Sequence, residues 1–237
     1  MSKIYRRRQV VVLAMILLSL LVMLASVFFD QASDSAPIQE SHQEMSDSNE
    51  SLASVELEKL EIKEHQIASK YVRSEFGSGW SKWQSCDTRQ KILARDLTGI
   101  TYDENNCTVL TGKLDDPYTG KVIDFTRGAS TSSAVQIDHV IALSNAWKTG
   151  ASYWDRAQRV AFANDDLELI AVDGPANNQK SNADASEWLP SNVAFQCQYI
   201  ARQIAVKVKY VLWVTQNEYN AMKNVLNTCP DQRLPSP

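Results

Sequence analysis

Histidine is scarce in this chain, and that scarcity excludes several kinds of site. Only three histidines occur among the 237 residues, so motifs that place two histidine ligands on one helix have no material here. The Gly-x-Ser-x-Gly turn of many serine hydrolases is absent, and so is the glycine-rich phosphate loop that ends in Gly-Lys-Ser/Thr. His139 is the one histidine inside the region with globular character. Chemistry that needs an imidazole therefore has to use it.

Cysteines are also few, and none of the four forms a Cys-x-x-Cys pair. Zinc sites usually draw their ligands from such close pairs, so a zinc knuckle is not expected. In an exported protein the four should form two disulfides, most simply Cys86–Cys107 and Cys197–Cys229. Each would close a local loop, with a stabilisation of about 3 kcal/mol. Four free, buried thiols are the alternative.

The chain lacks the basic excess of a tight DNA-binding module. Its formal net charge is −4, distributed as +4 over residues 1–8, −8 over 30–64 and zero over 65–237, where 18 basic residues balance 18 acidic ones. A neutral domain argues against a high-affinity duplex binder. It leaves room for an enzyme that contacts phosphates through a few cations.

One long apolar run stands out at residues 10–29, where only Ser19 and Ser26 interrupt 20 residues that follow a basic start. A helix of this length spans roughly 30 Å, the thickness of a bilayer core. Segment 1–29 is therefore predicted to be a membrane anchor with the rest of the chain outside the cell. A cleavable signal peptide, which would leave a secreted protein, is the alternative. Segment 30–64 is predicted to be an acidic, polar linker and 65–237 a single folded domain.

Patterning within the domain predicts an α+β fold. Turn residues at 115–120 separate two β-like segments, and Thr215 followed by Glu218 forms a capping box that divides the C-terminal helical stretch. Strands are expected at 108–114, 121–125, 134–139 and 167–172; helices are expected at 57–77, 87–97, 154–162, from 177 towards 188, and over 193–226.

The residues with chemical potential flank two of these strands. Asp138 and His139 end one strand, and Asn177 and Lys180 follow another. Oxygens from Asp138 and Asn177 suit a hard cation such as Mg²⁺. Consecutive side chains of a regular strand point to opposite faces, so Asp138 and His139 can serve one site only if the backbone bends there.

These motifs resemble those of the HNH, or His-Me finger (ββα-metal), endonucleases. The longer pattern is similar to exported bacterial nucleases related to the C-terminal nuclease domain of GmrSD-type restriction enzymes, over roughly residues 71–229. The pattern departs from the usual one at its middle position, which falls in the stretch 164–167. The residues that carry the resemblance are Asp116 to Gly120, Ile137 to Val140, Ala146-Trp147, Gly150-Ala151, Phe162 to Asp165, Asn177, Lys180 and Trp188 to Pro190.

The resemblance implies a small ββα-metal core embedded among longer helices, and a metal-dependent endonuclease acting on nucleic acid, with DNA favoured over RNA. His139 would be the general base, and Asp138 and Asn177 would hold one divalent cation, most simply Mg²⁺. Asn164 is the candidate for the middle position. Lys180 would assist catalysis and, with Arg159, contact phosphate.

Each of these residues also has a structural interpretation. Asp138 and His139 could be a hydrogen-bonded pair at a strand end, Asn177 could cap a helix, and Lys180 and Arg159 could be solvated cations. At the level of the whole domain, the alternatives are a non-catalytic DNA-binding domain at the cell surface and a phosphodiesterase whose substrate is not nucleic acid. No protein partner is indicated.

Overall fold

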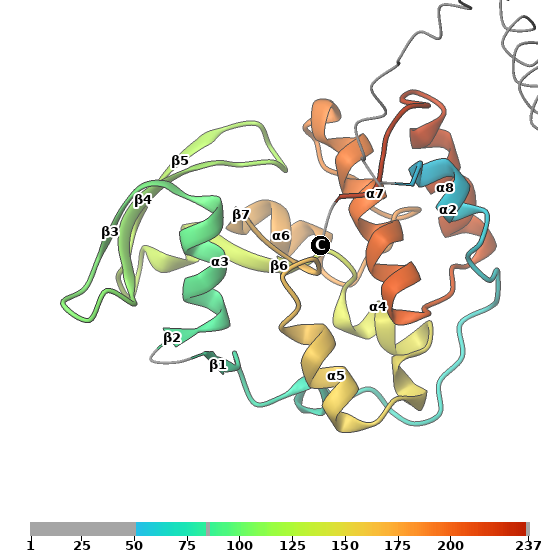
Figure 1. Cartoon of the computed structure of the whole chain (residues 1–237), viewed down its shortest axis with the longest axis horizontal. Helices are drawn as coiled ribbons and strands as arrows, with labels where there is room; N and C mark the ends of the chain where they lie inside the picture. Colours follow the sequence, from blue (N-terminus) through green and yellow to red (C-terminus); the bar gives the residue numbers. More distant parts are fainter. Residues whose placement is uncertain (1–50, 84–85, 236–237) are drawn as a thin grey trace, which may run out of the picture. The chain divides into compact units, whose positions relative to one another are not determined.

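The computed structural model describes residues 51–83 and 86–235 (Figure 1). They belong to one compact unit, 49–237. The predicted membrane segment, 10–29, lies outside the described residues. Within the part of the chain that the structure describes, no helix is both long and apolar enough to cross a membrane.

A three-stranded antiparallel sheet forms one side of the unit (Figure 1). It has the order β3 (Thr98–Tyr102), β4 (Val109–Asp115), β5 (Val122–Thr126), and α3 (Thr88–Asp96) packs against it. The two strands and the helix expected at 108–114, 121–125 and 87–97 are confirmed. β3 was not predicted, because its residues show little hydrophobic alternation and most are exposed. A short hairpin, β1 (Lys82–Trp83) and β2 (Cys86–Asp87), precedes α3.

A strand–strand–helix unit lies at the centre of the fold. β6 (Val135–His139) pairs antiparallel with β7 (Leu169–Asp173), and α6 (Gly174–Lys180) follows directly. Asp138 lies opposite Ile170, and His139 opposite Leu169. The helix expected from 177 towards 188 is only partly correct: it begins at Gly174 and ends at Lys180, where Ser181 adopts a positive φ of 52°.

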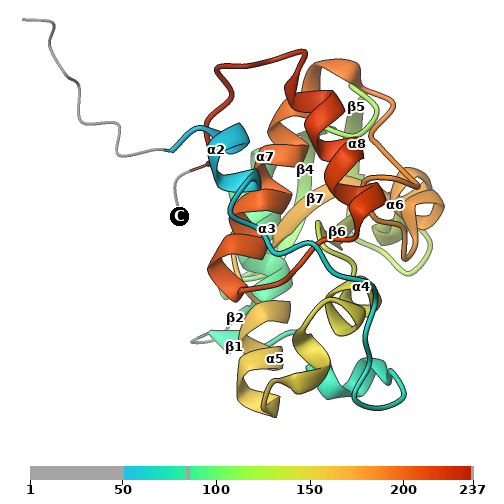
Figure 2. The ribbon, with the colours of Figure 1, turned by 90° about the vertical axis from the view of Figure 1, so that its right-hand side faces the viewer.

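Helices form the other side (Figure 2), where α7 (Val193–Tyr210), α8 (Gln216–Leu226) and α2 (Ala53–Leu57) pack together. The break predicted at Thr215 is confirmed, because its side chain accepts a hydrogen bond from the Glu218 amide and caps α8. α5 (Arg156–Ala163) starts at a capping box formed by Asp155 and Gln158. The remaining elements are α4 (Leu143–Lys148) and three 3₁₀ turns, η1 (Arg73–Phe76), η2 (Ser132–Ala134) and η3 (Ala151–Tyr153).

The helix expected over 57–77 is wrong. Residues between α2 and η1 instead form an extended segment whose backbone bonds to distant parts of the chain: the Lys63 amide donates to Val214 and the Gln66 amide to Lys148. The apolar side chains of this segment recur at a spacing close to that of a helix. Because the segment is extended, however, they do not form one apolar face. Leu57 and Leu60 are buried in the helical core, whereas Ile67 is exposed.

The β6–β7 ribbon separates two hydrophobic cores. Side chains from one of its faces, Ile137 and Leu169 among them, pack with α3 and the three-stranded sheet. From the other face, Ile170 and Val172 join the aromatic residues of the helical core. Because consecutive side chains alternate, the two neighbours at the end of β6, Asp138 and His139, point to opposite faces of the ribbon.

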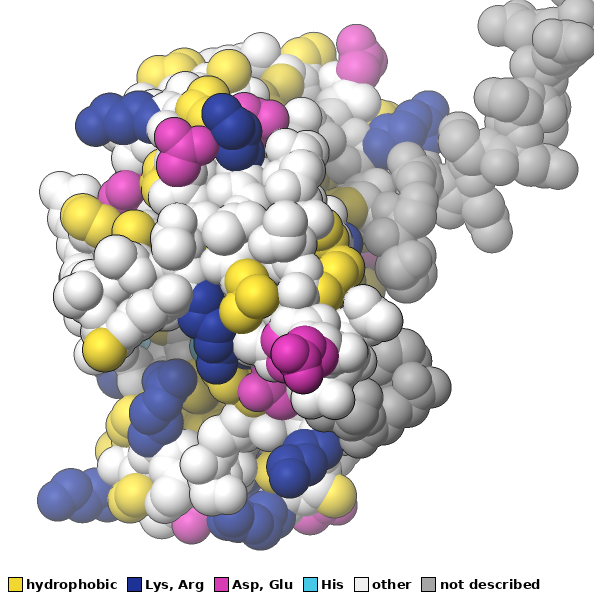
Figure 3. Space-filling model, turned by 90° about the vertical axis from the view of Figure 1, so that its left-hand side faces the viewer, with side chains coloured by type: hydrophobic (Ala, Val, Ile, Leu, Met, Phe, Trp, Pro, Cys, Tyr) yellow, Lys and Arg dark blue, Asp and Glu magenta, His cyan; other side chains and the backbone are white. Residues whose placement is uncertain are grey.

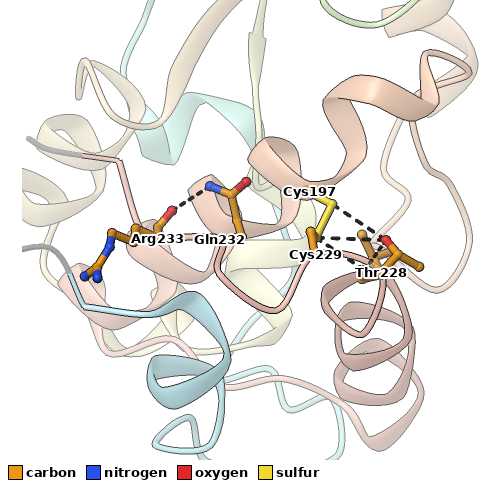
Figure 4. Close-up of a disulfide and its surroundings, with 6 residues drawn as sticks. Cys197, Thr228, Cys229, Gln232 and Arg233 are labelled. Atoms are coloured by element: carbon orange, nitrogen blue, oxygen red, sulfur yellow. Dashed lines mark hydrogen bonds between the residues drawn. A yellow bond between two sulfur atoms is a disulfide. The ribbon is translucent and has the colours of Figure 1, made fainter.

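Both predicted disulfides are present, and none of the described cysteines is free. Cys86 pairs with Cys107 beside the three-stranded sheet. Cys197 of α7 pairs with Cys229, three residues beyond the end of α8, and so ties α7 to the chain that follows α8 (Figure 4). Such cross-links are typical of proteins that fold outside the reducing cytosol.

Candidate active site

His139 lines a cavity of about 130 Å³, roughly ten times the room that one water needs. Its Nε2 lies 3.0 Å from the carbonyl oxygen of Ala163, at the end of α5. The last carbonyls of a helix have no partner within the helix, so this one is available to accept. With Nε2–H donating, the lone pair lies on Nδ1, and the ring is held in the tautomer that can accept a proton there.

The imidazole is buried and neutral. Burial lowers the pKa of His139 to about 3, with the charges of Arg73 and Lys180 adding to the effect, while its bond to Ala163 opposes it. Trp80 lies parallel to the ring, at an interplanar angle of 9° and a centroid distance of 5.6 Å. A neutral, oriented imidazole beside a cavity has a lone pair available to take a proton, but the burial that keeps the ring neutral also makes it a weaker base than a free imidazole.

Asp138 faces away from this cavity, into the helical core. Its two carboxylate oxygens lie 3.0 and 2.9 Å from Nζ of Lys180, and the Tyr118 hydroxyl donates to it at 2.5 Å. Lys180 also donates to the carbonyl oxygen of His139 at 2.8 Å. With Asp138 and Lys180 only 6% and 1% exposed, the pair is a closed, buried network behind the strand that carries the imidazole.

Asn177 lies on α6, where its amide group donates to Gln136 at 2.9 Å. The structure therefore brings Asp138 together with Lys180 and Tyr118, and Asn177 together with Gln136. No set of three or more His, Cys, Asp or Glu side chains suited to a metal ion occurs in the described ranges 51–83 and 86–235. A divalent ion on Asp138 would have to share its oxygens with a buried ammonium group. As these side chains lie, they do not fit a resident Mg²⁺.

The other predicted site residues hold parts of the chain in place. Arg159 donates to the carboxylate of Glu75 at 2.8 Å and to the backbone carbonyls of Glu75, Ala151 and Trp154. Asn164 accepts a hydrogen bond from the Ser81 amide at 2.8 Å, one residue from Trp80. Neither side chain contacts the imidazole. Arg159 is buried and paired, and Asn164 supports the segment that stacks on His139.

Glu168 is a further residue near the site that the sequence patterns did not single out. It directly precedes β7, is fully buried, and accepts the Ile141 amide on both oxygens at 3.2–3.3 Å, while its carbonyl accepts the Val140 amide. Burial raises the pKa of its carboxyl well above the usual range. Glu168 thus holds the two residues that follow His139. An acidic residue directly before an apolar strand is a signal that could have pointed to Glu168. Residues 165–168 contain three carboxylates, however, and the sequence does not distinguish among them.

A strand–strand–helix unit with a histidine at the end of its first strand is the core that the HNH resemblance implies. Residues 87–225 match the family described as GmrSD restriction endonucleases, C-terminal domain. A protein described as an uncharacterized secreted protein, from Arthroderma benhamiae, is 37% identical over 161 residues, which cover 67% of this chain and 76% of that protein. No solved structure matches. The chain belongs to the GmrSD C-terminal domain family.

Proposed function

We propose that this chain is an exported nuclease that hydrolyses phosphodiester bonds of nucleic acid, with His139 as the general base. The observation that carries the proposal is the imidazole itself, which is neutral, oriented by Ala163 and next to a cavity. Membership of a family of restriction-endonuclease domains supports the reaction class, and DNA is favoured over RNA as substrate.

In this reaction Nδ1 of His139 takes a proton from a water molecule in the cavity. The resulting hydroxide attacks phosphorus in line, a new P–O bond forms, and the bond to the 3′ oxygen breaks. The leaving oxygen then takes a proton from solvent. A positioned general base typically contributes about 10²–10⁴-fold to the rate.

The family suggests a divalent metal ion, which when bound would neutralise charge that develops on the phosphate and the leaving oxygen. Asp138 and Asn177 are the ligands that the sequence predicts, although as these side chains lie in the structure they do not fit the ion. Since Lys180 contacts both oxygens of Asp138, no step of the reaction is assigned to an ion.

Two features support an extracellular location for the enzyme. The relative from Arthroderma benhamiae is described as secreted, and two disulfides cross-link the domain. We also propose that segment 10–29 anchors the protein in the membrane, with a cleaved signal peptide as the alternative. Cell fractionation after expression of the full chain distinguishes the two.

A nicking assay with the purified full chain tests the activity. Supercoiled plasmid and a structured RNA are incubated with Mg²⁺, Mn²⁺, Ca²⁺ or Zn²⁺, and with EDTA. We expect cleavage by the wild type and a loss of about 10²–10⁴-fold in His139→Ala. His65→Ala is the matched control, because that histidine is exposed and outside the cavity, and it should retain activity. A wild type that cleaves neither polymer under any condition would refute the nuclease proposal.

A further inference from the structure

We propose that Arg73 forms the phosphate-binding subsite of the His139 cavity. The inference rests on the proposed function, and it assigns the phosphodiester to a cation other than those that the sequence patterns indicated. Arg73 is exposed and lines the cavity together with His139, Trp80 and Phe76.

The cavity wall is otherwise neutral. Among the described residues that line it, Arg73 is the only cation and no carboxylate is present; the others are Phe76, Gly77, Gly79, Trp80, His139, Leu143 and Ala163. One guanidinium without a competing acid gives the cavity a positive potential. A guanidinium can also donate two parallel hydrogen bonds to one phosphate.

The two cations expected to contact phosphate are used elsewhere. Lys180 is buried on the far side of β6 with Asp138. Arg159 is bound to Glu75 and to three backbone carbonyls. Neither can contact a substrate phosphate without giving up these interactions. Arg73 is exposed, and its side chain interacts with the half-buried Tyr71, so it can contact a phosphate without giving up an ion pair with any carboxylate that the structure describes.

The same contacts that occupy Arg159 hold Arg73 in place. Arg73 is the first residue of η1, and Arg159 fixes this turn through both the carboxylate and the carbonyl of Glu75. Phe76, at the other end of η1, is buried against Phe162 and Trp147. Arg159 is therefore a positioning residue for the turn that presents Arg73.

The face turned towards the viewer in Figure 3 shows Lys and Arg side chains gathered over its middle and lower part, around a recess. Acidic side chains are also visible on this face. A domain with no net charge can still have a local cluster of basic side chains that attracts a polyanion. Binding through it should weaken as salt rises.

The test compares Arg73→Gln and Arg73→Lys with Arg156→Gln. Arg156 is a matched control because it is also an exposed arginine and does not line the cavity. Its side-chain hydrogen bond to the Ser74 carbonyl is solvent-exposed, whereas the turn is fixed by Arg159 and the buried Phe76. With plasmid DNA and with bis(p-nitrophenyl) phosphate, Arg73→Gln should lower kcat/KM by roughly 10- to 100-fold, the effect of one hydrogen bond to a charged group. The loss with DNA should appear mainly in KM. Arg73→Lys should recover part of it, and Arg156→Gln should stay within about two-fold.

A binding measurement separates failure of this inference from failure of the nuclease proposal. Inorganic phosphate is titrated into wild type, Arg73→Gln and Arg156→Gln at constant ionic strength, and the Trp80 indole N–H is followed by NMR. A saturable shift that only Arg73→Gln loses supports the subsite, even if the wild type cleaves nothing. Equal shifts in all three proteins, no shift in the wild type, or equal kinetics for the Arg73→Gln and Arg156→Gln variants would overturn it.

Discussion

Replacing Lys180 with methionine should destabilise the domain severely. Lys180 does not line the His139 cavity, so the effect concerns stability and not a contact with substrate. Methionine keeps most of the length and apolar character of lysine but removes the ammonium group. The change deprives Asp138 of the bonds at 3.0 and 2.9 Å, and the His139 carbonyl of the bond at 2.8 Å. Only the Tyr118 hydroxyl would still contact the carboxylate.

The expected cost follows from the burial of the pair. Asp138 is 6% exposed and Lys180 1%, so water cannot replace the lost partner. Breaking a buried ion pair on one side typically costs about 3–5 kcal/mol, because a charge is left without compensation. Asp138→Asn should cost a similar amount, since it strands the ammonium group. In the double variant neither charge remains, so the combined loss should be smaller than the sum by roughly 1–3 kcal/mol.

The free energies of unfolding of wild type, Lys180→Met, Asp138→Asn and the double variant, measured in urea under non-reducing conditions, form a double-mutant cycle that gives the interaction energy of the pair. A cost below about 1 kcal/mol for Lys180→Met, or strictly additive single variants, would refute the description of this pair as a closed, buried network. The same proteins test the metal assignment. If Mn²⁺ stabilises Lys180→Met but not the Asp138→Asn variant, that carboxylate is a ligand for which lysine competes. Equal effects on both would place the ion elsewhere.

Three further predictions concern the rest of the fold. Because His139 has a folded pKa of about 3 and an unfolded one near 6.5, the unfolded state binds the proton first, so the free energy of unfolding falls as pH drops from 6.5 towards 3. His139→Asn should remove about 2–3 kcal/mol of the difference in wild-type stability between pH 7 and 4.5, measured by urea unfolding; an unchanged pH dependence would contradict the burial of the ring. Gly174→Ala should cost about 1–3 kcal/mol in the same assay, since the added Cβ would lie 2.1 Å from the Ser133 carbonyl oxygen, and a neutral effect would show that α6 can shift. Replacing Cys197 and Cys229 by serine should cost about 2–4 kcal/mol, read from thermal unfolding, and an unchanged midpoint would mean that α7 and α8 need no cross-link.

Local signals in the sequence determined much of the fold. The turn at 115–120 places β4 beside β5, and the cap at Thr215 separates α7 from α8. Both signals act within a few residues, so they can be found without knowing the tertiary structure. The segment between α2 and η1 could not be predicted in this way. Its backbone partners, including Val214 and Lys148, lie far along the chain.

The candidate site shows the same division. His139 could be identified because His65, the other histidine of the compact unit, lies outside the strand-end motif. The partner that orients it, Ala163, contributes only a carbonyl oxygen and leaves no trace in the sequence. Arg159 and Arg73 are both plausible phosphate contacts by residue type, and only the contacts with Glu75 distinguish the anchored arginine from the one that lines the cavity.

Strand alternation explains why Asp138 and His139 have different surroundings although they are adjacent. Had the chain bent after Ile137, both side chains could have faced one ion; instead β6 stays paired with β7 up to His139. The imidazole then faces the cavity, while the carboxylate faces Lys180 on α6 and Tyr118 in the β4–β5 turn. The carboxylate thereby fixes α6 against the back of the strand end, and Glu168 fixes the two residues that follow. The strand end that carries the imidazole is therefore held from both sides of the ribbon, which gives the proposed general base a fixed orientation.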